Sequence, residues 1–161
     1  MSDDPVLDRL LATGQPHEVV ACDPELADTA AFCEAYGYEL ADSANAIVVA
    51  GKADPPPLAA CLVLAVDRLD VNGVVRRRLG TRKASFASPD LTVELTGMQI
   101  GGVTPFGLPD DLPIWIDAGV MARQRVIVGG GGRDRKFLVA PAALAALPGA
   151  EVVEGLAKPA T

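Results

Sequence analysis

The hydrophobic positions of this chain follow helical spacing in some segments and strand-like spacing in others. Residues 3–13 carry leucine and valine at helical spacing and end before Gly14, which predicts a short amphipathic helix. The β-branched run 17–22 predicts a strand, and so do the aliphatic runs 45–50 and 59–66. A short polar connection joins the last two runs, so we expect them to pair antiparallel.

Proline and glycine punctuate the rest of the sequence. Asp23-Pro24 and Ser88-Pro89 each combine an N-cap residue with a proline at the first helical position, which predicts helices over 24–36 and 89–97. Asp70 can cap a helix over 70–79, and the glycines and prolines of 99–113 exclude regular structure there. Further strands are expected at 83–87, 114–116, 125–128 and 137–140, and a last helix at 141–147.

Strands and helices are interspersed without a regular βαβ order. Several strand pairs have short links, which favours antiparallel neighbours. We therefore expect an α+β fold with a mixed, mostly antiparallel, barrel-like sheet flanked by helices. No repeat or linker divides the sequence, so we expect one domain over residues 1–161 with its core at about 17–147 and a loose tail after Gly155.

The composition indicates where in the cell the protein acts and which kinds of site it lacks. Half the residues are apolar but no run approaches the roughly 20 residues that span a bilayer, and the acidic N-terminus does not resemble a signal peptide. We expect a cytoplasmic protein without membrane contacts. Cys22, Cys33 and Cys61 form no CxxC pair, so they are expected to be buried hydrophobes, and we expect neither a metal nor a cofactor.

Charge is distributed unevenly along the chain. The net charge of −7 argues against unselective DNA binding. Residues 1–67 carry a net charge of −10, whereas residues 68–161 carry +3, so a polyanionic partner would favour the second half. The densest basic cluster contains no acid and consists of Arg76, Arg77, Arg78, Arg82 and Lys83. Taken alone, this cluster is more simply a solvated helix face.

Side chains suited to catalysis are scarce. The one histidine, His17, begins a predicted strand, and no Ser–His–Asp or Cys–His set can be assembled around it. An enzyme of this composition would depend on positioning and backbone dipoles. Two glycine-rich segments, 101–107 and 129–133, could supply them, because glycine lets a ligand approach the main chain closely. A tight hairpin turn explains the second segment equally well.

In order, the segments TGMQIGGVTPFGLP, WID and VIVGGGGRDRKFLVAPAAL resemble the signature of the YbaK / prolyl-tRNA-synthetase-associated domain family. The upstream segments SANAIVVA and LGTRKASFAS strengthen the resemblance, which covers about residues 17–147. It implies a free-standing editing hydrolase that cleaves the ester between a wrong, small amino acid and tRNA, with tRNA for proline as one candidate. The implied partners are the acceptor end of aminoacyl-tRNA and, in some members, a synthetase.

The resemblance also implies roles for individual residues. Amides of Gly101 and Gly102 would hold the ester carbonyl, and Asn45 would position water or the terminal ribose. Editing members usually carry lysine where this chain has Asn45, so a non-catalytic module that binds aminoacyl-tRNA or a nucleotide is the alternative, and a structural partner of a synthetase is a third. The implied substrate-binding residues are Ser43, Thr104, Pro105, Phe106, Gly107, Asp117, Gly129, Gly130 and Arg133. The basic cluster defined above would bind tRNA, with Arg133, Arg135 and Lys136 as further attracting charges.

Overall fold

A computed structural model describes residues 4–159. In chain order its elements are α1 (Pro5–Ala12), β1 (His17–Ala21), α2 (Thr29–Tyr36), β2 (Ala44–Gly51), β3 (Leu58–Leu64), β4 (Asp67–Leu69), α3 (Arg76–Leu79), β5 (Ala84–Phe86), α4 (Pro89–Thr96), β6 (Ile114–Asp117), α5 (Ala118–Met121), β7 (Val126–Gly129), β8 (Arg135–Val139), α6 (Pro141–Ala145), β9 (Ala150–Val153) and β10 (Ala157–Pro159). No helix within residues 4–159 combines the length and the apolar character needed to cross a bilayer.

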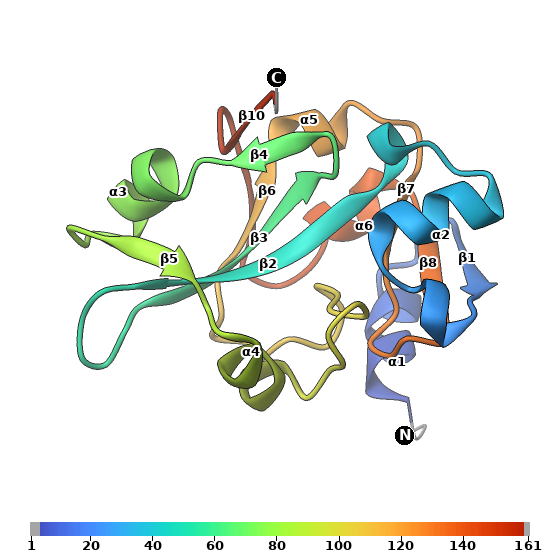
Figure 1. The fold of residues 1–161 in the computed structure, drawn as a ribbon, viewed down its shortest axis with the longest axis horizontal. Coiled ribbons are helices and arrows are strands. Elements are labelled where there is room, and N and C mark those ends of the chain that lie inside the picture. The colour runs from blue at the N-terminus through green and yellow to red at the C-terminus, as the bar shows by residue number, and fades with distance from the viewer. Residues whose placement is uncertain (1–3, 160–161) are drawn as a thin grey trace.

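The strands form three sheets, with orders β5-β2-β3-β6-β9, β1-β8-β7 and β10-β4 (Figure 1). Most neighbours are antiparallel, including β2 with β3, whereas β6 lies parallel to both β3 and β9. The expected α+β class with a mixed, mostly antiparallel sheet is confirmed. The sheets do not close into a barrel within residues 4–159.

The central strand β3 is buried along most of its length because both of its faces are covered. Leu62 packs in a cluster with Phe106 and Phe137, and Val63 packs on the opposite side with Trp115. A strand covered on both faces has no polar side to solvate, which explains its continuous aliphatic sequence.

The two larger sheets meet where β2 begins. Ser43 forms an isolated parallel bridge with Ile127 of β7, and α2 packs Phe32 against Ile127 and Leu138. The ribbon shows α2 beside the start of β2 and α4 below the same strand (Figure 1). This junction is where the two glycine-rich segments also arrive, so it is the region in which to seek a site.

Two helices and the tail differ from the sequence-based prediction. The predicted helix 24–36 is divided into a single turn at Pro24–Leu26 and α2, and the helix predicted over 70–79 starts as a π-type turn at Val71–Val75. The expectation of a loose tail after Gly155 is wrong as far as Pro159. Leu156 is fully buried and β10 pairs with β4, so nonlocal burial orders a segment that lacks strong local signals.

Candidate functional site

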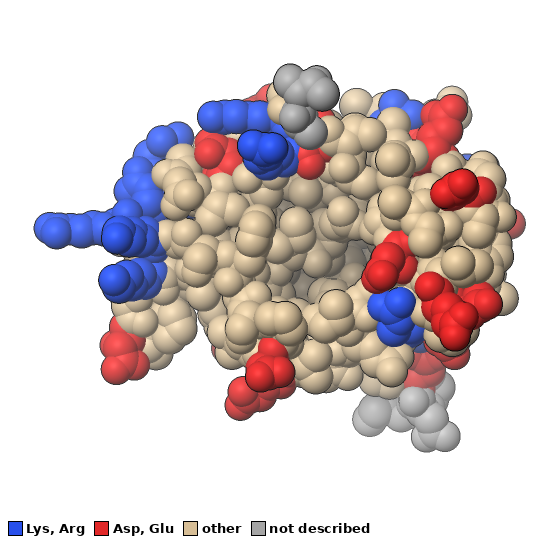
Figure 2. Space-filling view, viewed as in Figure 1, with Lys and Arg blue, Asp and Glu red and all other residues tan. Residues whose placement is uncertain are grey.

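A pocket of about 330 Å³ opens at the junction of the two larger sheets. Figure 2 shows a hollow near the middle of this face. The walls come from the start of α2, the first half of β2, the connection from β5 to α4, the loop 100–103 and the end of β7. This volume lies at the small end of ligand pockets, which suits a group the size of an amino acid. Of the residues expected from the sequence, the pocket brings together Ser43, Asn45, Gly101 and Gly129.

The two glycine-rich segments dock against each other, backbone to backbone. The Gly131 amide donates to the Gly102 carbonyl at 2.6 Å. A β-carbon at Gly102 would lie 2.3 Å from the Gly132 carbonyl oxygen, and one at Gly129 would lie 2.3 Å from the Val103 carbonyl oxygen. Only glycine fits at such distances. The second segment is therefore both the turn between β7 and β8 and the support for the first loop.

The amides of Gly101 and Gly102 differ in availability. The Gly102 N–H donates to the Gln99 carbonyl at 2.9 Å, so it cannot bind a ligand as the loop stands, and the expected pair of donors is corrected to one. The Gly101 N–H has no acceptor within residues 4–159, and Gly101 lines the pocket. Gly101 has φ +92°, a conformation that favours glycine.

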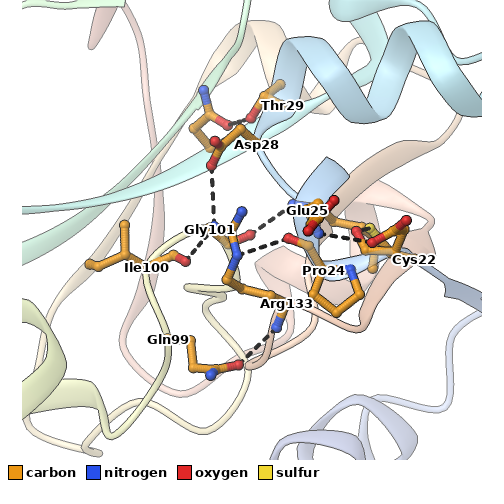
Figure 3. Close-up of polar contacts among 12 residues, drawn as sticks. Cys22, Pro24, Glu25, Asp28, Thr29, Gln99, Ile100, Gly101 and Arg133 are labelled. Carbon is orange, nitrogen blue, oxygen red and sulfur yellow. Dashed lines mark hydrogen bonds and ion pairs between the residues drawn. The ribbon is translucent and has the colours of Figure 1, made fainter.

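Arg133 ties the first loop to the segment that leads into α2. Its Nη1 donates to the Ile100 carbonyl at 2.8 Å and pairs with Asp28 at 3.2 Å, and its Nε donates to the Pro24 carbonyl at 3.0 Å (Figure 3). The Ile100 carbonyl and the Gly101 N–H belong to one peptide group. A cation bonded to that carbonyl polarises the group, so the Gly101 N–H becomes a stronger donor.

Asn45 presents an oriented amide to the pocket. The Thr29 hydroxyl donates to Asn45 Oδ1 at 2.8 Å, which fixes the side chain. The Asn45 Nδ2 group has no acceptor within residues 4–159. A fixed neutral donor of this kind can bind a water molecule, a hydroxyl or a carbonyl oxygen.

Lys136 is the pocket residue whose position the sequence did not reveal. It lies on β8, its Nζ donates to the Gly101 carbonyl at 2.8 Å, and it is only 6% exposed. Burial lowers the pKa of its ammonium group. The sequence grouped Lys136 with the surface arginines, although its place two residues before Leu138 puts it on the strand face that packs under α2.

Part of the first loop lies beneath the pocket instead of lining it. Phe106 is fully buried and packs edge-to-face on Phe137 with ring centroids 6.0 Å apart, so it anchors the loop in the core. Thr104 and Pro105 are also buried, and none of the three lines the pocket. The Thr104 hydroxyl has no partner among residues 4–159.

Other expected site residues lie elsewhere. Gly107 and Gly130 line a second hollow beside α1, and Arg133 acts through the loop without lining the pocket. Asp117 is buried at the end of β6, where its carboxylate accepts from the Gly119 amide at 3.0 Å and from the Ala157 amide at 3.0 Å. These bonds cap α5 and hold β10, which gives Asp117 a structural role.

The basic cluster Arg76, Arg77, Arg78, Arg82 and Lys83 lies around α3. Lysine and arginine side chains gather at the left edge of Figure 2, apart from the hollow. Arg78 pairs with Glu151 and lies 4.8 Å from the centroid of the Trp115 ring. Arg77, Arg82 and Lys83 form no ion pair within residues 4–159. The cluster is thus a surface feature and not part of the pocket.

Comparison with known proteins supports a relationship with editing domains. The aminoacyl-tRNA editing domain family matches residues 23–147. The Bacillus subtilis protein YwhH, whose function is uncharacterized, is 29% identical over 108 residues, which are 67% of this chain and 66% of YwhH, just under two thirds. A crystal structure of a candidate trans-editing enzyme for prolyl-tRNA synthetase has a TM-score of 0.78 and 28% identity, covering 98% of this chain and 99% of that one. A hypothetical protein, APE2540, shares the fold with a TM-score of 0.84 at 22% identity, covering 96% of this chain and all of its own.

Proposed function

Because the chain belongs to the aminoacyl-tRNA editing domain family, we propose that it is a cytoplasmic trans-editing deacylase that hydrolyses the ester of a mischarged tRNA. The observation that carries this proposal is the Gly101 N–H, which has no acceptor within residues 4–159 and belongs to a residue that lines an amino-acid-sized pocket. The expected substrate is a small amino acid, with tRNA for proline as one candidate carrier.

In the proposed reaction, water attacks the ester carbonyl and releases the amino acid and the free tRNA. The oxyanion that develops accepts a hydrogen bond from Gly101 N–H, and removing one such donor costs about 10²–10³ in rate in other hydrolases. Asn45 Nδ2 orients the water or a hydroxyl of the terminal ribose. The apolar wall, which includes Ala46, Ile47 and Val128, accepts the amino-acid side chain.

The basic cluster around α3 is proposed to attract the tRNA backbone. Replacing both Arg77 and Arg82 by alanine is expected to raise KM for aminoacyl-tRNA several-fold and to leave kcat unchanged, because neither residue lines the pocket. The logarithmic salt dependence of binding should weaken by about 0.7–0.9 for each tRNA phosphate that the variant no longer neutralises.

The control for this prediction is Arg125→Ala. The Arg125 side chain is 65% exposed and lies outside the basic cluster, just before β7. If the double variant and the control have the same KM and the same salt dependence, the cluster is only a solvated helix face.

A second candidate, a binding module without hydrolysis, has one observation in its favour. Within residues 4–159 the pocket lining carries no histidine and a single carboxylate, Asp28, which is paired with Arg133. No imidazole or carboxylate of the lining is therefore free to act as a general base. In this case the same Gly101 and Asn45 donors would hold the aminoacyl group without activating water.

A deacylation screen over tRNAs charged with correct and incorrect amino acids separates the two functions. The deacylase proposal predicts that at least one ester of a small amino acid is cleaved well above its spontaneous rate. Tight binding of the same tRNA with an intact ester would instead assign the binding module, and neither binding nor cleavage across the screen would refute both.

A further inference from the structure

Lys136 is a buried cation without a buried anion beside it. The ionisable groups that surround it are Cys22, Cys33, Asp28 and Arg133. Burial raises the pKa of both thiols, so they stay neutral at neutral pH, and Asp28 is engaged by Arg133. Lys136 forms no ion pair within residues 4–159. A buried ammonium in this setting opposes folding, and groups of this kind concentrate at functional sites.

The Lys136 ammonium completes a pair of cationic contacts on one turn of the loop. Its Nζ is 2.8 Å from the Gly101 carbonyl oxygen, and Arg133 Nη1 is 2.8 Å from the preceding carbonyl, that of Ile100. These two carbonyls belong to the peptide groups on either side of the Gly101 α-carbon. In a trans peptide the N–H points opposite to the carbonyl, so Arg133 sets the direction of the Gly101 N–H through the Ile100 carbonyl, and Lys136 fixes the peptide group on the other side of the Gly101 α-carbon.

The surroundings of Lys136 distinguish it from a purely structural contact. Its Nζ lies 5.6 Å from the centroid of the Phe32 ring, a distance typical of cation–π contacts. Its remaining N–H groups have no acceptor within residues 4–159, and the residue lines the pocket. The ammonium therefore holds the loop and also places positive charge in the lining of the pocket.

We infer that Lys136 is a positioning residue of this pocket: its ammonium holds the Gly101 carbonyl and so fixes the backbone conformation at Gly101, in which the N–H that Arg133 orients through the Ile100 carbonyl meets the substrate carbonyl. This inference rests on the proposed hydrolysis. It assigns a specific task to a residue of β8 that the sequence places among surface charges.

Lys136→Met tests the inference, because methionine keeps the approximate length of the side chain and removes the charge and the donors. We expect kcat to fall by about 10- to 100-fold, the loss that a misplaced reacting group produces, with KM for aminoacyl-tRNA nearly unchanged. Lys136→Gln keeps a neutral donor one atom shorter, and its kcat should lie between those of the methionine variant and the wild type. The control is Lys158→Met on β10, since Lys158 is 70% exposed.

Stability provides the readout that separates positioning from structural support. The pKa of Lys136 is lower in the folded than in the unfolded protein, so its destabilising effect is fully present below the folded pKa and disappears as the pH rises above the unfolded value. Lys136→Met should therefore melt no lower than the wild type at neutral pH, and any gain should shrink at alkaline pH. A methionine variant with wild-type kcat, or one that loses activity only in proportion to its folded fraction, overturns the inference.

A readout independent of turnover keeps this inference separate from the proposed function. If the wild type cleaves no ester in the screen, the amide resonance of Gly101 can still be compared between the wild type and Lys136→Met by NMR. The inference expects this resonance to shift more than that of Gly155, which has no neighbouring atom within 4 Å of a β-carbon position. An unchanged Gly101 resonance rejects it whatever the activity.

Discussion

Gly102→Ala is expected to reduce ester hydrolysis by at least about 10²-fold, the scale of losing a positioned donor. The new β-carbon would lie 2.3 Å from the oxygen and 2.6 Å from the carbon of the Gly132 carbonyl, and backbone atoms cannot move aside as a flexible side chain can. The two glycine-rich segments must separate, which breaks the bond from the Gly131 amide to the Gly102 carbonyl. Overpacking of this kind also costs about 1–3 kcal/mol of stability. Single-turnover deacylation and denaturant unfolding measure the two effects.

Gly155→Ala is the matched control for this variant. Gly155 has φ +70°, so alanine there is strained by about 1–2 kcal/mol, but no atom lies within 4 Å of the added methyl group. Gly155 lies between β9 and β10, away from the pocket lining. The control should lose stability and keep its activity. Equal activity of Gly102→Ala and Gly155→Ala would show that loop docking does not support catalysis.

Asn45→Ala is expected to lower kcat by about 10²-fold, the scale of losing one donor to a reacting group. The substitution removes the Nδ2 donor from the pocket and leaves β2 intact, since the main-chain pairing of residue 45 with Val63 does not depend on the side chain. Single-turnover rates at saturating protein measure the effect, and circular dichroism checks that the fold persists.

Thr29→Val tests whether the orientation of the Asn45 side-chain amide matters as well as its presence. Valine has the shape of threonine but lacks the hydroxyl that donates to Asn45 Oδ1 at 2.8 Å. The Asn45 amide then remains but is free to rotate, so a smaller loss than that of Asn45→Ala is expected. If Asn45→Ala hydrolyses the ester at the wild-type rate, Asn45 only lines the pocket and does not take part in the reaction.

Local signals account for much of the fold. Ser88 caps α4 by accepting from the Leu91 amide, and Gly37, Gly80 and Gly97 end helices in the left-handed conformation, at the C-terminal ends of the ranges predicted from the sequence. The pairing of β9 with β6 and of β10 with β4 was not predicted. These short strands contain polar residues and are ordered by distant partners, which a local pattern does not encode.

The site was predictable to the level of segments but not of individual donors. Both glycine-rich segments and Asn45 were identified from the sequence, and all three reach the pocket. Which amide is available depends on which carbonyls are already bonded, and the Gln99 contact that occupies Gly102 is visible only in three dimensions. Lys136 was misplaced for a similar reason, since basic neighbours in the sequence suggested a surface position whereas the strand turns it inward.

The proposal that the Gly101 N–H binds the aminoacyl carbonyl is tested most directly by NMR titration with a non-hydrolysable analogue. The ligand is adenosine that carries alanine through an amide at its 3′ position. The claim predicts that the Gly101 amide proton moves downfield as the pocket fills, while that of Gly102 changes little because it already donates to Gln99. A Gly101 resonance that stays in place while those of Asn45 and Gly129 shift to saturation would contradict the claim.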